Sequence, residues 1–326
     1  MSAHPPVVAV LVQNRDDRPA GLEALRHRVE LRFVDEAGLA AGVTGAQVLF
    51  LWDFFSSAVR DAWDSCGDLE WIHVAAAGVD TLLFPALRDS GVAVTNARGT
   101  FDRPIAEFVL ASVLAHAKRL HESRDLQRAH VWRHRETLEV RGTNVLVVGT
   151  GAIGREMARM LDAVGMQVRG AGRTPTERDP DFGTVHPSDD LPAHVGWADH
   201  VVNATPLTDA TRGLFDARVF EAMKPDAHFV NIGRGPSVVE SDLVAALEAG
   251  RPAAASLDVF EREPLPSDSP LWDIPGVVVS AHMSGDVVGW RDTLARQFVD
   301  NLLRWLDGGE LVNVVDKRLG YVPARA

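Results

Sequence analysis

Short apolar runs alternate with helical patterns in two series along the chain, and this alternation constrains the fold more than any other feature. In the first hundred residues, β-branched and apolar runs occur at 7–12, 29–34, 46–52, 69–76 and 92–97. Amphipathic stretches at helical spacing, 21–28 and 56–66, lie between them. Strands that alternate with helices are typical of a parallel sheet, so this series predicts one doubly wound α/β domain.

A second series of β/α units begins after a long apolar stretch, 105–120, which predicts a buried helix that bridges two domains. A helix is expected at 153–164, and strands at 144–149, 166–172, 200–206, 228–233, 253–260 and 277–283. This series is long enough for a complete dinucleotide-binding domain of its own.

The tail of the chain carries one more amphipathic helix, with Leu294, Phe298 and Leu302 on a single stripe. Because the second sheet already has its helices, we expect the chain to cross back near Trp290 and this helix to cover the first sheet. The prediction is therefore two domains, formed by 1–98 with 288–326, and by 99–287.

Composition excludes several classes of protein. The net charge is −12, from 33 basic and 45 acidic residues, and no basic cluster occurs, so neither nucleic acid nor an anionic membrane is an expected partner. The single cysteine, Cys66, cannot form a disulfide framework or a thiolate metal site. We interpret Val7–Val12 as a first strand with no signal peptide and find no run of membrane-spanning length, so a cytoplasmic protein is expected. The histidines are scattered, and no metal site is predicted.

A glycine-rich turn links the first strand and helix of the second series. VLVVGTGAIGREMARML has G-x-G-x-x-G spacing, in which glycines permit a tight turn and close approach of the backbone to a pyrophosphate at the helix N-terminus. Glycine turns also serve plain packing, but the strand–turn–helix context favours a dinucleotide. The candidate residues are Gly149, Gly151, Ala152, Ile153 and Gly154.

The end of the next strand bears on which dinucleotide is bound. A carboxylate there would hold the adenosine ribose, and it would repel a 2′-phosphate. Here the strand ends in Gly172, Arg173 and Thr174, which leave room and supply a bidentate donor and a hydroxyl. NADP(H) is therefore favoured over NAD(H). The alternative is that Arg173 is only a solvated loop charge.

Three ionisable residues each follow an apolar strand of the second domain, namely Arg234, Glu263 and His282. In a parallel sheet these strand ends meet at one edge, where α/β proteins bind ligands. Histidine suits a general acid–base role, a neighbouring carboxylate would fix its tautomer, and arginine offers a fork for a substrate carboxylate. Each residue alone is more often structural, but the three together predict a site.

The segments around these residues resemble the D-isomer-specific 2-hydroxyacid dehydrogenase family. The resemblance rests on NATPLTDATRGLF, VNIGRGPSVVESDLVAALEAG, SLDVFEREPLP followed by PLWDIP, SAHMSG, and WIHVAAAGVD in the first domain. It covers nearly the whole chain and implies a Rossmann cofactor domain inserted in a flavodoxin-like substrate domain. The implied reaction is hydride transfer between a nicotinamide and a 2-keto or D-2-hydroxy acid.

The resemblance also implies roles for single residues. Glu263 would hydrogen-bond the catalytic His282, and Arg234 would bind the substrate carboxylate together with the backbone of Ala76, Ala77 and Gly78. Asp258 would position the nicotinamide carboxamide, while Glu261 and Arg262 match variable, solvated positions. Further residues expected beside the cofactor are Thr205, Pro206, Gly233, Ser284 and Gly285.

Substrate identity is less constrained. Trp52, Phe54 and Phe55 follow a strand of the first domain and either line an apolar pocket for the substrate side chain or belong to the core. Glyoxylate, hydroxypyruvate and larger 2-keto acids all stay open, while a glutamate at 263 argues against formate dehydrogenase. Trp132 resembles a tryptophan that reaches the partner subunit, so a homodimer through 100–140 is expected.

The alternative function is a dinucleotide-sensing binding protein without significant turnover. The family includes transcriptional corepressors, the C-terminal binding proteins, in which the same fold binds peptides. Acidic charge argues against that alternative for this chain.

Overall fold

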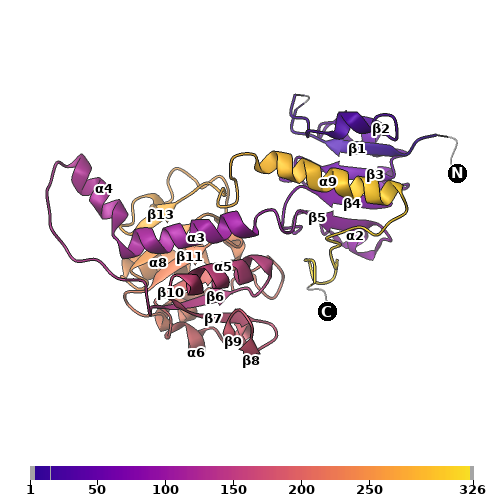
Figure 1. Ribbon diagram of the computed structural model, residues 1–326. Coiled ribbons are helices and arrows are strands. Elements are labelled where there is room, and N and C mark those ends of the chain that lie inside the picture. Colours follow the sequence, from indigo (N-terminus) through magenta and orange to yellow (C-terminus); the bar gives the residue numbers. More distant parts are fainter. Residues whose placement is uncertain (1–3, 15, 324–326) are drawn as a thin grey trace. The chain divides into compact units, whose positions relative to one another are not determined.

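The computed structural model describes residues 4–14 and 16–323 and divides the chain into two compact units (Figure 1). Unit 1 comprises 1–101 and 287–326, and unit 2 comprises 102–286. The boundaries expected from the sequence were 98/99 and 287/288.

Unit 1 is built on a five-stranded sheet in the order β2-β1-β3-β4-β5, with all neighbouring strands parallel. The strands are β1 (Val7–Leu11), β2 (Glu30–Val34), β3 (Val48–Leu51), β4 (Trp71–Val74) and β5 (Ala93–Asn96). Its helices are α1 (Leu39–Val43), α2 (Pro85–Asp89) and α9 (Trp290–Leu306). The prediction of a parallel α/β domain is confirmed.

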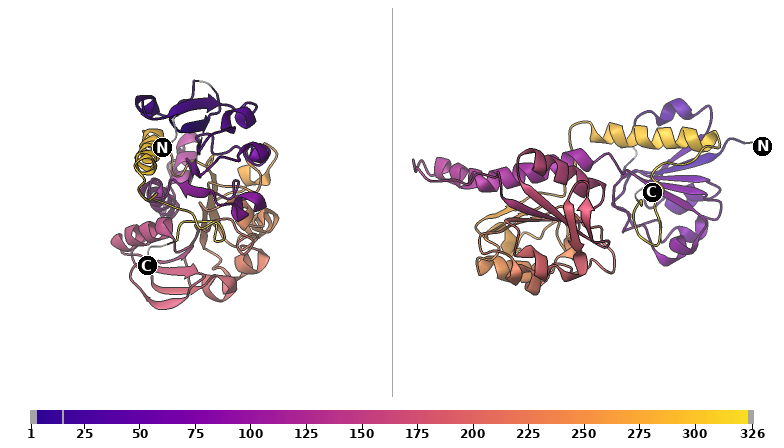
Figure 2. Two further views of the ribbon diagram at one scale, coloured as in Figure 1. Left: turned by 90° about the vertical axis from the view of Figure 1, so that its right-hand side faces the viewer. Right: turned by 60° about the horizontal axis from the view of Figure 1, so that its bottom comes forward.

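The tail helix α9 packs on the sheet of unit 1, as the sequence predicts (Figure 2). The ring of Phe298 stacks on Phe50 with centroids 3.9 Å apart and on Trp71 with centroids 5.4 Å apart. Leu294 and Leu302, on the same stripe of α9, are fully buried. This aromatic stack ties residues near the end of the chain to the first core.

The two helices expected at 21–28 and 56–66 are wrong in type. The first segment forms only a 3₁₀ helix, Leu22–Leu25, and the second forms turns that end in a 3₁₀ helix, Trp63–Ser65. Most backbone bonds of the second segment close three residues back, as in the bond from Trp63 N–H to the Arg60 carbonyl. Leu22, Leu25 and Val59 are nonetheless buried, so the amphipathic pattern indicated which side chains face the core and not which type of helix or turn forms.

Unit 2 contains an eight-stranded sheet in the order β13-β12-β11-β10-β6-β7-β9-β8. The strands are β6 (Asn144–Val148), β7 (Gln167–Gly172), β8 (Thr176–Asp179), β9 (Gly183–Pro187), β10 (His200–Asn203), β11 (His228–Asn231), β12 (Ala254–Leu257) and β13 (Val277–Val279). The helices are α3 (Asp102–Ala117), α4 (Leu120–Arg128), α5 (Ala152–Ala163), α6 (Pro192–Val195), α7 (Ala217–Ala222) and α8 (Glu240–Glu248). All pairs are parallel except β8 with β9.

The sequence pattern missed the β8–β9 hairpin at the edge of this sheet. Thr176, Glu177 and Arg178 of β8 are exposed, so the strand lacks the apolar run that marks an interior strand. Four expected strands are also too long, because β10, β11, β12 and β13 end at 203, 231, 257 and 279. The residues beyond these ends form the loops that carry the candidate site.

Helix α3 is buried along one stripe, not on every side as its composition predicts. Ile105, Val109, Val113 and Ala117 are buried at intervals of four, and α5 packs against the helix. Phe108 on another face is only half-buried. Among residues 4–14 and 16–323, no helix is long and apolar enough to cross a membrane.

Candidate active site

The candidate site forms where β11, β12 and β13 end side by side in the sheet of unit 2. These strands are parallel neighbours, so the loops that follow them leave the sheet at the same edge. Arg234 lies in the first loop, Glu263 in the second and His282 in the third. Three residues far apart in sequence are thereby brought to one edge, as expected of parallel strands.

His282 and Glu263 form a hydrogen-bonded pair. Nδ1 of His282 lies 2.7 Å from Oε2 of Glu263, and each side chain is about one-third exposed, at 33% and 32%. Since an ionised carboxylate can only accept a hydrogen bond, Nδ1 carries the hydrogen and donates the hydrogen bond to Glu263. The other ring nitrogen, Nε2, is the atom that can exchange a proton with a bound molecule.

The carboxylate of Glu263 is held in its ionised form. Burial by itself raises the pKa of this group, but hydrogen bonds from His282 and from the backbone N–H of Phe260, together with the charges of His282 and Arg234, lower the pKa below its usual value. The Phe260 N–H lies 2.9 Å from Oε1. Both carboxylate oxygens thus accept a hydrogen bond, one from the backbone of the same loop and one from the histidine.

The turn that carries His282 is anchored by the buried carboxylate of Asp258. The backbone N–H groups of Met283 and Ser284 donate to its two oxygens over 2.9 and 3.0 Å, and the Ser280 hydroxyl donates as well. His282 has a φ of 51°, in the left-handed region that a residue with a Cβ adopts only at some cost. Asp258 is 1% exposed and stabilises this conformation.

Sequence reasoning assigned Asp258 to the cofactor and did not detect its bonds to the turn. The backbone N–H of His282 also donates to the Asp258 carbonyl, over 2.8 Å. Asp258 and Ser280 are 22 residues apart, so no sequence signal indicated their contact and only the fold makes them neighbours.

Arg234 lies beside the loop that bears Glu263. A Cβ added at the adjacent Gly235 would lie 1.8 Å from the carbonyl oxygen of Phe260, so only glycine permits the two loops to approach this closely. One Arg234 nitrogen, Nη1, donates to the carbonyl of Gly233 over 2.8 Å, which orients the guanidinium.

A buried amide network, which sequence reasoning missed, joins the loops after β10 and β11. The Asn203 amide donates to Asn231 over 2.9 Å and to Ser237 over 2.6 Å. Its oxygen accepts from the backbone and hydroxyl of Thr205, and Asn231 accepts from the N–H of Gly233. Asparagine at the end of two neighbouring apolar strands, in VVNATP and FVNIG, was the available signal. The network fixes Thr205 and Gly233, two residues expected beside the cofactor.

The glycine-rich turn has the geometry that a dinucleotide pyrophosphate requires. A Cβ at Gly154 would lie 2.0 Å from the carbonyl oxygen of Gly149, and Gly149 itself has a φ of 112°. Helix α5 begins at Ala152, and no side chain caps its N-terminus. Backbone N–H groups of this turn, including those of Gly151 and Ile153, are therefore suited to hold an anion.

Two of the three residues expected to select the cofactor, at the end of β7, are exposed. Gly172 is buried, and a Cβ there would lie 2.8 Å from the Thr150 hydroxyl. Arg173 and Thr174, which follow it, are both exposed. The pair is accessible to a group bound near the glycine-rich turn.

The candidate substrate residues of unit 1 divide into two kinds. Ala76, Ala77 and Gly78 follow β4 and are half-buried, and the N–H of Ala97 donates to the Ala76 carbonyl over 2.9 Å. In contrast, Trp52 is only 4% exposed and its indole N–H donates to Asp17, so it belongs to the core.

The two phenylalanines after Trp52 differ from it. Phe54 packs partly buried against the core, and its ring lies 4.6 Å from that of Phe55. Phe55 is 66% exposed, which leaves it as the most accessible aromatic ring of this segment.

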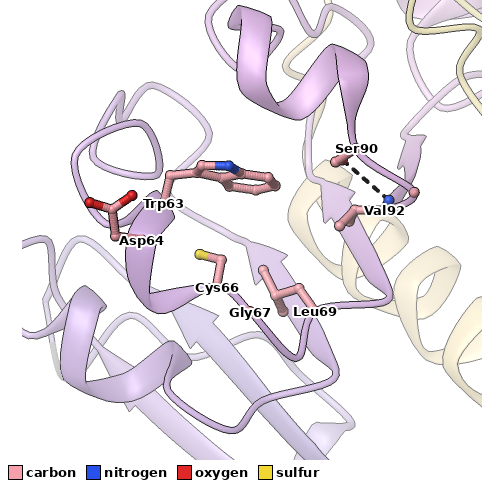
Figure 3. Close-up of a pocket in the computed structure, with 8 residues that line it drawn as sticks. Trp63, Asp64, Cys66, Gly67, Leu69, Ser90 and Val92 are labelled. Atoms are coloured by element: carbon pink, nitrogen blue, oxygen red, sulfur yellow. Dashed lines mark hydrogen bonds between the residues drawn. The ribbon is translucent and has the colours of Figure 1, made fainter.

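A pocket of about 330 Å³ lies in unit 1, away from all of these residues (Figure 3). Burial raises the pKa of the Cys66 thiol in its wall to about 11, so the thiol is protonated and unreactive at neutral pH. No group of three or more His, Cys, Asp or Glu suited to a metal ion occurs in the described part of the chain.

Comparison with known proteins identifies the family. The model of the NAD-binding domain of D-isomer specific 2-hydroxyacid dehydrogenases matches residues 110–284. Glyoxylate/hydroxypyruvate reductase A of Yersinia enterocolitica is 31% identical over 260 residues, which are 78% of this chain and 82% of the relative. The chain belongs to the D-isomer specific 2-hydroxyacid dehydrogenase family.

Solved structures of this dehydrogenase family agree with the fold. An NADPH-dependent glyoxylate/hydroxypyruvate reductase of Sinorhizobium meliloti, in complex with NADP and sulfate, is 30% identical, with a TM-score of 0.84, and the match covers 98% of this chain and 100% of the relative. A 2-hydroxyacid dehydrogenase of Xanthobacter autotrophicus, in complex with NADPH and MES, is 31% identical, with a TM-score of 0.81 and coverage of 96% and 99%. The predicted fold class, α/β with two parallel-sheet domains, is confirmed.

Proposed function

We propose that this protein is an oxidoreductase that uses NADP(H) to reduce a 2-keto acid to a D-2-hydroxy acid, with glyoxylate and hydroxypyruvate as the first substrates to test. The observation that carries the proposal is the His282–Glu263 pair, held at 2.7 Å beside Arg234 at the strand ends of a domain with a dinucleotide turn. The names of the relatives favour a reductase over the dinucleotide-sensing alternative.

The glycine-rich turn supports dinucleotide binding, because a Cβ at Gly149 or Gly154 would collide with neighbouring backbone and prevent this tight turn, whereas the space beside Gly151 is open for a pyrophosphate. Gly151, Ala152 and Ile153 would supply N–H groups from the start of α5. The bound nicotinamide would supply the hydride. Asp258, Thr205, Pro206, Gly233, Ser284 and Gly285 are proposed to line the same site.

The protein's own residues would supply the proton and hold the substrate. Protonated His282 donates from Nε2 to the carbonyl oxygen, while ionised Glu263 stabilises the imidazolium. Arg234 binds the substrate carboxylate and polarises the carbonyl. In the oxidative direction, His282 accepts the proton instead.

The preference for NADP(H) over NAD(H) rests on the end of β7. No acidic residue occupies that position, and exposed Arg173 and Thr174 can bind a 2′-phosphate. The S. meliloti relative was solved with NADP. Replacing Arg173 by alanine should weaken NADPH binding and leave NADH binding nearly unchanged.

Unit 1 is proposed to bind the substrate. The backbone of Ala76, Ala77 and Gly78 would add donors for its carboxylate, and Phe54 and Phe55 would contact its side chain. Trp52 was also expected to contact the substrate side chain. Because it is buried, we propose that it supports Phe54 and Phe55 from the core instead.

A homodimer is proposed through 100–140. Several apolar side chains of this segment are exposed, namely Leu120, Val131, Trp132 and Leu138, and Trp132 is 100% exposed. An exposed apolar group of this kind indicates a protein interface. Light scattering after size exclusion should give a dimer, and replacing Trp132 by serine should weaken it.

A cytoplasmic location is also proposed, since the one cysteine is buried as a thiol.

The direct test is loss of reduced-nicotinamide absorbance with NADPH or NADH and a panel of acids from glyoxylate and hydroxypyruvate to phenylpyruvate. The proposal expects turnover with at least one acid, faster with NADPH, and loss of turnover in His282→Gln. Folded protein that binds dinucleotide but reduces no acid would contradict the reductase and favour the sensor.

A further inference from the structure

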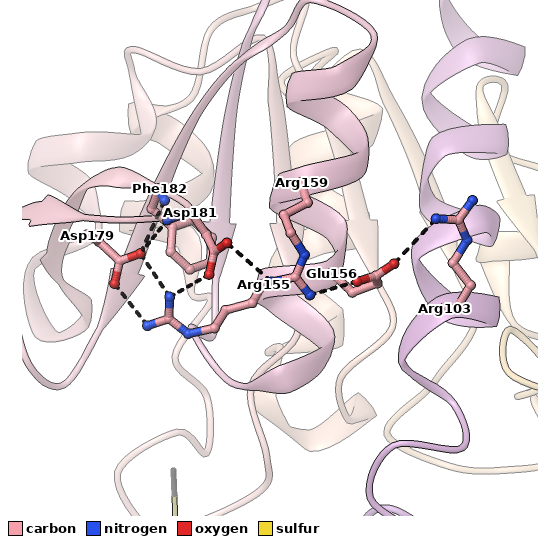
Figure 4. Close-up of polar contacts among 7 residues, drawn as sticks. All are labelled: Arg103, Arg155, Glu156, Arg159, Asp179, Asp181 and Phe182. Atoms are coloured by element: carbon pink, nitrogen blue, oxygen red, sulfur yellow. Dashed lines mark hydrogen bonds and ion pairs between the residues drawn. The ribbon is translucent and has the colours of Figure 1, made fainter. Parts of the chain in front are cut away.

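An ion-pair network connects the start of α5 to the β8–β9 hairpin (Figure 4). The guanidinium of Arg155 binds both carboxylate oxygens of Asp179 at 2.9 Å and one oxygen of Asp181 at 2.7 Å. Asp179 in turn accepts from the backbone N–H groups of Asp181 and Phe182. Arg155 thus closes the tip of the hairpin by a bidentate bond and a second carboxylate.

The two carboxylates are well shielded from water. The side chains of Asp179 and Asp181 are 7% and 15% exposed, whereas that of Arg155 is 34% exposed. The Arg155 hydrogen bond lowers the pKa of Asp179 against the effect of burial, so the carboxylate stays ionised. Bidentate pairs of this kind hold geometry more strictly than an exposed ion pair does.

The clamped hairpin contacts the end of β7 from the side. Phe182 is 2% exposed, its ring lies under the Arg155 guanidinium at 5.6 Å, and a Cβ at Gly170 would lie 3.0 Å from it. Strand β9 also pairs with the last residues of β7, from Gly170 to Gly172. A shift of the hairpin would therefore move the end of β7 as well.

The exposed loop between β7 and β8 is short. Only residues 173–175 separate Gly172, the last residue of β7, from Thr176, the first of β8. The loop that carries Arg173 and Thr174 is consequently held at both ends by strands of the sheet. The anchor on the β8 side depends on the hairpin that Arg155 clamps.

We propose that Arg155 is a positioning residue for dinucleotide selectivity: by clamping the β8–β9 hairpin, it places Arg173 and Thr174 to receive a 2′-phosphate. This inference rests on the proposed function, since it assumes that these two residues bind that group. Arg155 acts through the hairpin and need not touch the dinucleotide. Phosphate recognition by an arginine fork needs placement within a fraction of an ångström, which a loosened hairpin would lose.

The test measures dissociation constants of NADPH and NADH by fluorescence titration, without turnover, for wild type, Arg155→Gln, Arg155→Lys and the control Arg159→Gln. Arg159 lies one turn further along α5, binds Asp181 and Glu156, and has no bond to Asp179. Arg155→Gln should reduce the preference for NADPH over NADH about fivefold to tenfold, as expected for one misplaced charge-assisted contact. Lysine should restore part of it, and Arg159→Gln should keep the wild-type ratio.

A merely structural role gives a different result. Arg155→Gln would then lower the melting temperature and weaken both dinucleotides equally, and an unchanged ratio would overturn the inference. If the glutamine variant does not fold, the ratio of Arg155→Lys decides alone. Wild-type protein with no preference for NADPH would instead contradict the proposed NADP(H) specificity, and this inference with it.

Discussion

Replacing Glu263 by glutamine should separate the charge of this residue from its hydrogen bond. An amide oxygen can still accept from Nδ1 of His282, so the tautomer and ring orientation are kept, while the amide nitrogen cannot accept and the bond from the Phe260 N–H is lost. The negative charge beside the ring is lost. The variant therefore tests whether Glu263 favours the protonated histidine or only orients it.

The size of the effect follows from the geometry of the pair. Hydrogen bonds to charged groups contribute about 1.5–3 kcal/mol, and the lower end applies because both side chains are one-third exposed and water weakens the interaction. At about 1.4 kcal/mol for each factor of ten, kcat/KM for reduction should fall about tenfold.

The sign follows from the proton that reduction consumes. The imidazole that donates this proton carries a positive charge, so loss of the neighbouring carboxylate charge disfavours the reactive form and slows reduction. In the wild-type protein Glu263 carries this charge, because its pKa is lowered below the usual value.

The assay is kcat/KM for keto-acid reduction from pH 5.5 to 9, with saturating NADPH. Glu261→Gln is the matched control, because it removes the same charge from the same loop while Glu261 accepts from the backbone of Glu240. Glu261 is exposed, in agreement with the expected solvated position, and its N–H also donates to the Glu240 carboxylate. A Glu263→Gln profile that overlays wild type would refute the role of the charge.

Three further predictions concern binding and stability. Gly154→Ala should abolish dinucleotide binding in a fluorescence titration, since its Cβ would lie 2.0 Å from a carbonyl oxygen; retained affinity would contradict the tight turn. Phe298→Ala should destabilise unit 1 by about 3–5 kcal/mol in urea unfolding, because a fully buried ring stacked at 3.9 Å is removed, and a loss under 1 kcal/mol would contradict that packing. Burial lowers the pKa of His73 to about 3 and of His200 to about 4, below the usual 6.5, so their stabilising effect is complete above pH 6.5 and is lost as pH falls toward those values. The free energy of unfolding from urea titrations should therefore decline from pH 6.5 to 4, by on the order of 1 kcal/mol per histidine per pH unit, and a flat profile would contradict the lowered pKa values.

Local patterns were sufficient for the architecture and for the main candidate residues. Alternating β and α patterns, the glycine spacing and the charges after apolar runs are properties of neighbouring residues, and they predicted both sheets and the strand-end positions of Arg234, Glu263 and His282. The apolar stripe on α9 also predicted that this helix covers a sheet. Phe50 and Trp71, on strands of the first sheet, form the surface on which it packs.

Long-range contacts decided the remainder. Neighbouring residues do not show which groups Asp258, Asn203 and Arg155 pair with, because each partner lies more than 20 residues away in the sequence. Polar edge strands and short 3₁₀ helices depend on neighbours for their stability and so lack a strong pattern of their own. In this protein, sequence periodicity determined which residues reach the edge of the sheet, and tertiary hydrogen bonding determined how they are held there.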